Sequence, residues 1–366
     1  MKVNVITRHA VSNYGSILQS IATQQLVEDL GCDCEIIDYI RTDENYYNYE
    51  KTLLDRKENW KKNYLKKVIY LFFRVPESII AGKYFEKLRN KNLKLTKRYA
   101  SIEEMISDCP KADIYMTGSD QVWGRTGNGD YDSAYLLSFV EGTKISYAAS
   151  FGNIVKEPHI NNFFSEYLSM YSKILVREDA AVDYLKELGF NSYQVLDPTM
   201  LYGIEYWNKY LDPINEKDYI LVYQLHNDRK LGDIAQKIAK KKHKKLIRIS
   251  ASFHQISREG RFIYLPTLGK FLNYIKNADL LVTDSFHGTA FSLIFQTQFI
   301  EILPNSNTEE RNKSILRSFG LSERIVSTYE DYEKIVKPID FSLVNEKLAK
   351  QRKKSISLIG DFFQDR

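Results

Sequence analysis

The stretch from Asp279 to Phe299 constrains the fold of this chain most, because it reads as a strand, a tight polar turn and a helix. Residues 280–283 form a short apolar run of the kind that is buried in a parallel sheet, and apolar residues recur at helical spacing over residues 290–295. A turn between such a strand and a helix N-terminus is where open α/β sheets bind ligands and where backbone N–H groups favour anions. His287 in this turn is therefore a candidate acid or base.

The length of the chain predicts two domains. At 366 residues it exceeds what one hydrophobic core usually supports. Strands and helices alternate in both halves, which predicts an α/β fold throughout. The segment from Pro198 to Asp218 has no strong periodicity and is the best candidate boundary. We therefore expect a first domain at residues 1–200, a second at 201–340, and a C-terminal amphipathic helix within 341–366.

A segment of different composition interrupts the first half. From residue 43 to residue 99 the chain is rich in Lys, Tyr and Asn and has helical periodicity. One side collects the apolar residues Trp60, Tyr64, Val68 and Leu71, with Lys61, Lys62, Lys66 and Lys67 around them. This pattern favours a helical insertion packed on the first domain, and the alternative is contact with an anionic membrane surface.

Charge and cysteine content exclude several classes of protein. The chain has 52 basic and 47 acidic residues, a net charge of +5 that is too balanced for a dedicated nucleic-acid binder but compatible with an anionic small substrate. The three cysteines Cys32, Cys34 and Cys109 lack metal-ligand spacing, so we expect reduced thiols and no metal site. No apolar run approaches the roughly twenty residues of a membrane span, and Asn4 and Arg8 argue against a signal peptide. A cytoplasmic protein is expected.

Six short motifs occur in order along the chain. They are Asn13-Tyr14-Gly15-Ser16 with Leu18-Gln19, then 118–123, 146–152, Val176-Arg177-Glu178, Asp197-Pro198-Thr199 and 283–291. Together they resemble the polysaccharide pyruvyl transferase family, whose members transfer a pyruvyl group from phosphoenolpyruvate to a sugar. The resemblance covers nearly the whole chain. It implies two Rossmann-like domains facing each other across a cleft, similar to the B-type glycosyltransferase architecture, with the helical insertion in the first domain.

The resemblance also implies a donor site. The motif histidine of the family falls on His287, and the arginine that helps to hold phosphoenolpyruvate falls on Arg177. Family members often have Arg-Leu before this histidine, whereas this chain has Ser285-Phe286, so another basic residue must supply the missing charge or the donor differs. Three arginines expected in turns or loops are candidates, namely Arg8, Arg261 and Arg311. The predicted donor-binding residues are Arg177, Ser285, Phe286, Gly288, Thr289 and Arg311.

The chemistry of the donor indicates what these residues must do. Phosphoenolpyruvate carries a carboxylate and a phosphate on an enol, and a ketal forms from it only after the methylene carbon is protonated. His287 could donate that proton and recover one from an attacking hydroxyl, a role typically worth about 10² to 10⁴ in rate. Arg177 could hold the donor bidentately, and the alternative is a salt bridge with Glu178 or Asp179. The scheme needs no metal and no cofactor besides phosphoenolpyruvate as co-substrate.

The turns of the first half should face the acceptor, since the carboxyl edge of a parallel sheet binds ligands. Asp120 could accept a proton from a sugar hydroxyl, and Trp123 could stack on a pyranose. The alternatives are turn-stabilising hydrogen bonds for Asp120 and core packing for Trp123. The predicted acceptor-binding residues are Asn13, Tyr14, Gly15, Ser119, Gln121 and Trp123.

The sequence therefore predicts a transferase that moves a pyruvyl group to two hydroxyls of a sugar in a bacterial surface polysaccharide or its lipid-linked precursor. One alternative is a nucleotide-sugar glycosyltransferase, which would need a ribose-binding carboxylate. The segment after His287 offers only Glu301, Glu309 and Glu310 for this role, without a defined spacing. A second alternative is a non-catalytic polysaccharide-assembly protein held at the inner face of the membrane by the insertion. The expected partners are phosphoenolpyruvate and a sugar or lipid-linked oligosaccharide, with no nucleic acid.

Overall fold

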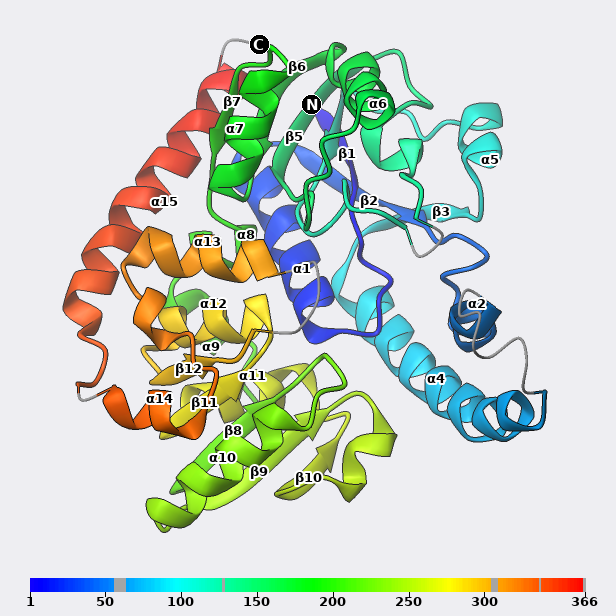
Figure 1. Ribbon diagram of the computed structural model, residues 1–366. Coiled ribbons are helices and arrows are strands. Elements are labelled where there is room, and N and C mark those ends of the chain that lie inside the picture. Colours follow the sequence, from blue (N-terminus) through cyan, green and yellow to red (C-terminus); the bar gives the residue numbers. More distant parts are fainter. Residues whose placement is uncertain (56–63, 127–128, 304–308, 336, 365–366) are drawn as a thin grey trace. The chain divides into compact units, whose positions relative to one another are not determined.

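The computed structural model describes residues 1–55, 64–126, 129–303, 309–335 and 337–364. It confirms the predicted α/β class, because the strands form two separate parallel sheets (Figure 1). The chain divides into two compact units, with Met1–Pro198 and Leu358–Arg366 in the first and Thr199–Ser357 in the second.

The first unit contains a parallel sheet of seven strands in the order β3-β2-β1-β4-β5-β6-β7. The strands are β1 Lys2–Ile6, β2 Asp33–Tyr39, β3 Leu95–Tyr99, β4 Ile114–Thr117, β5 Thr143–Ala149, β6 Tyr171–Val176 and β7 Ser192–Gln194. The strand order reverses between β1 and β4. In open α/β sheets ligands bind at the carboxyl ends of the strands at such a switch point.

The helices of the first unit follow the predicted alternation. They are α1 Tyr14–Asp29, α2 Tyr49–Asp55, α4 Tyr64–Asn92, α5 Ile102–Ser107, α6 Pro158–Leu168 and α7 Asp179–Glu187, with the 3₁₀-helix η1 Ser133–Leu136. The side chain of Asn13 caps α1 by accepting the N–H of Gly15 at 2.9 Å, and Pro158 opens α6. Gly31, at φ +78°, follows the end of α1, where a left-handed residue is favoured.

The predicted insertion at 43–99 is helical over α2 and α4 but ends earlier than expected. Residues 95–99 form β3, which pairs in parallel with β2. The sequence Leu-Thr-Lys-Arg-Tyr lacks the apolar run of a buried strand because β3 lies at the sheet edge, where polar residues are tolerated. The predicted residues Trp60, Lys61 and Lys62 lie outside the described residues.

The second unit contains a parallel sheet of five strands in the order β10-β9-β8-β11-β12. The strands are β8 Tyr219–Tyr223, β9 Lys245–Ser250, β10 Arg261–Tyr264, β11 Leu280–Thr283 and β12 Phe299–Glu301. β8 and β11 are buried along their whole length, as expected for central parallel strands. The core of this unit includes Ile220, Val222, Ile234, Ile238, Val282 and Ile300.

The helices that follow the boundary are more numerous than the sequence predicted. They are α8 Pro198–Leu201, α9 Ile204–Asn208, α10 Lys230–Lys241, α11 Leu268–Lys276, α12 Phe286–Phe295, α13 Glu309–Phe319, α14 Tyr329–Lys334 and α15 Phe341–Gln364, with the 3₁₀-helices η2 Phe253–Ser257 and η3 Ser322–Arg324. The expected loop positions of Arg261 and Arg311 are wrong, because Arg261 begins β10 and Arg311 lies in α13.

A buried carboxylate joins the first turn of the chain to the edge of its sheet. Asp38 near the end of β2 contacts Nε2 of His9 at 3.0 Å and Nε of Arg98 at 3.0 Å, with Nε of Arg89 at 3.9 Å. The other ring nitrogen of His9 lies 3.0 Å from the carbonyl oxygen of Thr7. Burial alone would raise the pKa of Asp38, but the hydrogen bond and charge of His9, with Arg89 and Arg98, lower it to about 2.

We expect Asp38→Asn to destabilise the protein by about 3–5 kcal/mol, because His9, Arg89 and Arg98 lose their shared counter-charge. Urea denaturation at pH 7 measures the change, and Asp33→Asn at the exposed start of the same strand is the control. The folded state lowers the pKa of Asp38, so its contribution is present above about pH 4 and is lost as the pH falls toward about 2. An Asp38→Asn variant as stable as Asp33→Asn would contradict the role of the cluster.

Candidate functional site

The predicted polar turn after β11 is shorter than expected, because α12 begins at Phe286 and places His287 in its first turn. Ser285 is the N-cap, and its hydroxyl oxygen accepts the N–H of Gly288 at 3.3 Å. The hydroxyl of Thr283 donates to the carbonyl oxygen of Tyr223 on β8 at 2.7 Å and accepts the N–H of Ser285 at 3.0 Å. These bonds fix the entry of α12 against two neighbouring strands.

Close packing requires glycine at position 288, independently of its predicted role in binding the donor. A Cβ at this position would lie 2.6 Å from the hydroxyl oxygen of Thr283 and 3.3 Å from its Cβ. Only glycine lets the helix approach β11 this closely. The N–H of Gly288 that was predicted to bind phosphate caps the helix instead.

Thr289, predicted to bind the donor, is engaged inside the second unit. This side chain is fully buried, and its hydroxyl donates to Oε2 of Glu301 on β12. Asn312 of α13 donates to Oε1 of the same carboxyl group and also to the backbone oxygen of Asp284 at 3.2 Å. Burial, with the charge of Asp284, raises the pKa of Glu301 to about 8 against the opposing hydrogen bonds from Thr289 and Asn312.

Asp284 holds the turn after β8 beside the turn after β11. Its Oδ1 accepts the N–H of Leu225 at 2.7 Å, and its Oδ2 accepts the N–H of His226 at 2.9 Å and contacts Nδ1 of that ring at 3.1 Å. Neither Asp284 nor His226 was predicted to have a role. The rule that carboxyl ends of parallel strands meet at one edge, applied to β8 as well as β11, would have placed them together.

Cationic side chains accompany His287 in the second unit. His287 is 4% exposed and stands edge-on to the buried ring of Phe286, with centroids 5.2 Å apart. Arg248 and Arg258 both donate to Oε1 of Gln224, at 2.9 and 3.0 Å. Burial, followed by the charge of Arg258, lowers the pKa of Arg248 to about 10.

Arg311 also belongs to this group of cations. It lies in α13 at 9% exposure, and its charge acts on Glu301. His226, whose side chain is 31% exposed, is more accessible. Arg248 of β9, Arg258 and Arg311 of α13 therefore belong to the same unit as His287, although no arginine stands directly before His287.

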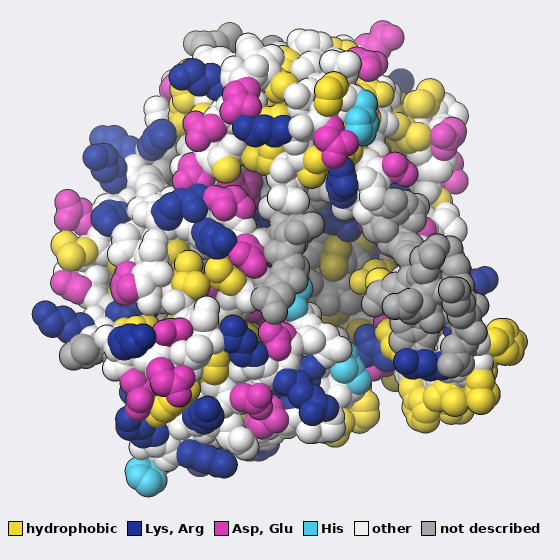
Figure 2. All heavy atoms as spheres, in the orientation of Figure 1, with side chains coloured by type: hydrophobic (Ala, Val, Ile, Leu, Met, Phe, Trp, Pro, Cys, Tyr) yellow, Lys and Arg dark blue, Asp and Glu magenta, His cyan; other side chains and the backbone are white. Residues whose placement is uncertain are grey.

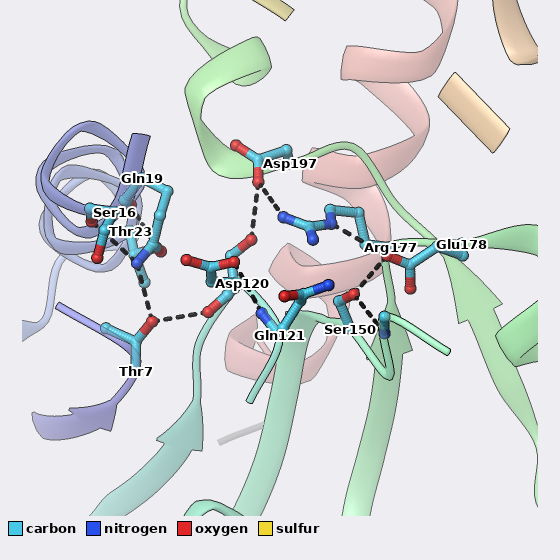
Figure 3. A network of polar contacts seen from close by, with 12 residues as sticks. Thr7, Ser16, Gln19, Thr23, Asp120, Gln121, Ser150, Arg177, Glu178 and Asp197 are labelled. Carbon is cyan, nitrogen blue, oxygen red and sulfur yellow. Dashed lines mark hydrogen bonds and ion pairs between the residues drawn. The ribbon is translucent and has the colours of Figure 1, made fainter. Parts of the chain in front are cut away.

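In the first unit Arg177 is paired rather than open to an anion (Figure 3). Its side chain is 2% exposed, with Nε 3.2 Å from Oε1 of Glu178 and Nη1 3.1 Å from Oδ2 of Asp197. Burial would lower the pKa of Arg177, but Glu178, Asp197 and Asp120 together raise it. Arg177 therefore forms the salt bridge given as the alternative, with Glu178 and with Asp197 in place of Asp179, and its contact with a donor stays a prediction.

Four of the sequence motifs meet in this network. The hydroxyl of Ser119 donates to Oδ2 of Asp197 at 2.8 Å, and the hydroxyl of Ser150 donates to Oε1 of Glu178 at 2.5 Å. Thr7 at the end of β1 donates to the backbone oxygen of Ser119 at 2.7 Å. Figure 3 shows these groups close together at the carboxyl ends of their strands. The hydroxyl of Ser119 that was predicted to meet an acceptor is therefore engaged internally.

Asp120 is partly exposed and has an unusual backbone. Its φ is +78°, its carboxylate accepts the N–H of Gln121 at 2.8 Å, and its carbonyl oxygen accepts the N–H of Ser150 at 3.0 Å. Ala148 and Gly152 near the end of β5 are also left-handed, at φ +54° and +68°. Left-handed non-glycine residues are uncommon, and strained backbone clusters at functional sites. Asp120 therefore stays a candidate base.

Two residues of the predicted acceptor set have side chains that are buried in packing, which for Trp123 is the alternative given above. Trp123 is 1% exposed, donates from Nε1 to the carbonyl oxygen of Tyr135 at 3.2 Å, and packs edge-on against Phe151. Tyr14 is fully buried, with its ring 5.0 Å from that of Phe85. Gly15 is also buried, in the first turn of α1. Asn13 and Gln121 are the members of the predicted acceptor set that are partly exposed.

The fold defines a class of enzymes. UDP-GlcNAc 2-epimerase from Neisseria meningitidis bound to UDP-GlcNAc has a TM-score of 0.53 and 10% identity, with 100% of both chains covered. A putative UDP-N-acetylglucosamine 2-epimerase from Listeria monocytogenes gives 0.51 and 12%, covering 96% of this chain and 90% of that one. UGT89C1 from Arabidopsis thaliana gives 0.50 and 10%, covering 100% and 98%. These similarities show the α/β fold of B-type glycosyltransferases and related epimerases.

The family follows from the sequence match. The family model of polysaccharide pyruvyl transferase matches residues 13–307, and the chain therefore belongs to this family of transferases. A search of curated proteins finds no match to the sequence.

We expect Glu301→Gln to stabilise the protein at pH 8 but not at pH 5. The folded state raises the pKa of Glu301 from 4.5 to about 8, so the wild-type protein loses stability as the pH rises through this window. The amide does not titrate, so the variant should melt at least about 2 °C above the wild type at pH 8. Melting curves between pH 5 and 8 measure the difference, with exposed Glu310→Gln as the control. A difference that is the same at every pH would contradict a protonated Glu301.

Proposed function

We propose that the protein transfers a pyruvyl group from phosphoenolpyruvate to two hydroxyls of a sugar in a bacterial surface polysaccharide, such as an exopolysaccharide, or in its precursor. The products are a cyclic ketal and phosphate, and the reaction takes place in the cytoplasm. Membership of the family supports the reaction class. The observation that carries the proposal is the position of His287 in the first turn of α12, where backbone N–H groups favour an anionic donor.

In this mechanism His287 donates a proton to the methylene carbon, and the neighbouring carbon becomes an oxocarbenium-like centre. One sugar hydroxyl forms a bond to that centre and gives up its proton, which His287 recovers. The bond to the phosphate oxygen then breaks with its electron pair on the phosphate. A second hydroxyl forms a bond to the same carbon and gives up its proton to a base, which closes the ketal. Asp120 of the first unit is the proposed base for a sugar hydroxyl, supported by its partial exposure and left-handed backbone.

The donor is a polyanion and needs cations. Arg177 is offset by Glu178 and Asp197, so we assign the donor charges to the second unit. Arg258 and Arg311 are the proposed replacements for the arginine missing before His287. Arg258 is partly exposed, and Arg311 lies on the helix that also contacts Glu301 through Asn312. A guanidinium can bind a carboxylate or phosphate through two parallel hydrogen bonds.

His287→Ala should lower the rate of phosphate release by about 10² to 10⁴, because it removes the proposed acid. The assay combines phosphoenolpyruvate with a panel of galactose and N-acetylmannosamine glycosides. His159→Ala, at an exposed position of α6, should leave the rate unchanged. Absence of phosphate release across the panel, with His287→Ala equal to wild type, would sink the proposal.

Arg258→Gln and Arg311→Gln should each weaken binding of phosphoenolpyruvate about tenfold or more, since each removes a charge-assisted hydrogen bond. The shift in melting temperature with phosphoenolpyruvate concentration measures binding. Arg261→Gln, which removes an exposed arginine of the same unit, is the matched control. If neither variant differs from this control, the donor charges lie elsewhere.

A nucleotide-sugar glycosyltransferase is the second candidate. The similar Neisseria meningitidis structure is bound to UDP-GlcNAc, so this fold can accommodate a nucleotide sugar. The same melting experiment with a nucleoside diphosphate separates the two candidates. Stabilisation by the diphosphate, with none by phosphoenolpyruvate, would favour the glycosyltransferase.

A further inference from the structure

The first half of α4 carries an exposed apolar stripe. We define the outer stripe as Leu65, Ile69, Phe72, Phe73 and Ile80, which are exposed by 70%, 51%, 73%, 68% and 55%. The spacing of three and four residues keeps these side chains on one side of the helix for about four turns. Figure 2 shows hydrophobic side chains gathered over this part of the first unit. Contiguous exposed apolar surface of this kind marks an interaction site.

The polar side of the same helix faces the protein. The hydroxyl of Tyr70 donates to Glu50 of α2 at 3.0 Å, and Arg74 donates to the same carboxylate at 3.3 Å. The hydroxyl of Ser78 donates to the backbone oxygen of Tyr46 at 3.1 Å. A helix on a water-facing surface normally buries its apolar side and exposes its polar side. Here several polar side chains of α4 contact the protein while the outer stripe stays exposed, so the stripe is suited to an apolar environment.

The charged residues of α4 indicate which apolar environment covers the outer stripe. Residues 64–76 contain Lys66, Lys67 and Arg74 and no acidic residue. Lys67 pairs with Asp55 of α2, and Arg74 pairs with Glu50 and Glu77. Basic residues beside aromatic and aliphatic ones are typical of helices that lie in the interface of an anionic membrane. No helix among the described residues is long and apolar enough to cross a membrane. A position in the plane of the interface therefore fits α4 better than a span.

We propose that the outer stripe inserts into the surface of a bilayer that contains anionic lipids, with Lys66 and Lys67 at the level of the headgroups. Lysine stems can lie along the apolar surface while the ammonium groups stay in water. The binding itself does not depend on the proposed reaction. Membrane binding would also bring the protein to a lipid-linked sugar acceptor in the same membrane. Only this consequence rests on the proposed function.

Vesicle sedimentation tests the proposal with the full chain. Wild-type protein should sediment with vesicles of phosphatidylcholine and phosphatidylglycerol and only weakly with phosphatidylcholine alone. The double variant Phe72→Ser/Phe73→Ser should bind at least about tenfold more weakly, because both rings leave the bilayer. The matched control is Leu343→Ser/Ile356→Ser in α15, which removes two apolar side chains of 59% and 48% exposure and should bind like wild type.

Several results would overturn the proposal. Wild-type protein that binds neither kind of vesicle would do so, as would equal binding by wild type and Phe72→Ser/Phe73→Ser. A concentration-dependent dimer that this variant abolishes, without vesicle binding, would assign the stripe to a second copy of the chain. Phosphate release with a soluble acceptor should be the same in wild type and variant. That assay keeps failure of membrane binding distinguishable from failure of the proposed reaction.

Discussion

The turns of the first unit depend on the ion pairs that Arg177 forms with Glu178 and Asp197. A guanidinium that is 2% exposed must be offset by carboxylates and hydrogen bonds, because an unpaired buried charge is costly. The two carboxylates in turn accept hydroxyl hydrogens from Ser119 and Ser150. One buried cation therefore brings together the residues that follow β4, β5, β6 and β7. Four short motifs that look separate in the sequence are parts of one polar network.

Within the part of the chain that the structure describes, the buried carboxyl groups of the second unit are stabilised without a salt bridge to arginine. Asp284 is satisfied by two backbone N–H groups and the ring of His226. Glu301 has no cation within ion-pair distance among the described residues, and burial raises its pKa to about 8, so it is mostly neutral at pH 7. Arg177 of the first unit, by contrast, lies within ion-pair distance of two carboxylates.

The sequence predicts elements better than it predicts partners. Apolar runs and helical periodicity located β11 and α12 and predicted the alternation of strands and helices. The edge strands β3 and β10 were not predicted from the sequence, because strands at a sheet edge lack long apolar runs. The sequence did not predict the hydrogen-bond partners of candidate site residues when those partners are distant along the chain. Ser119 bonds to a residue 78 positions away, and Thr289 to one 12 positions away. Residue type alone does not show whether a hydroxyl is engaged or open to a ligand.

The helix α4 illustrates the same limit for a surface. Periodicity can show that Tyr64, Val68 and Leu71 share a side, but it does not say whether that side faces the protein or the solvent. The favoured interpretation packed the apolar side inward. In the structure, Glu50 of α2 attracts the polar side of α4 through Tyr70 and Arg74, and the ring of Phe72 is 73% exposed. The contacts of one buried carboxylate therefore set the direction of the helix, and the exposed apolar side follows from it.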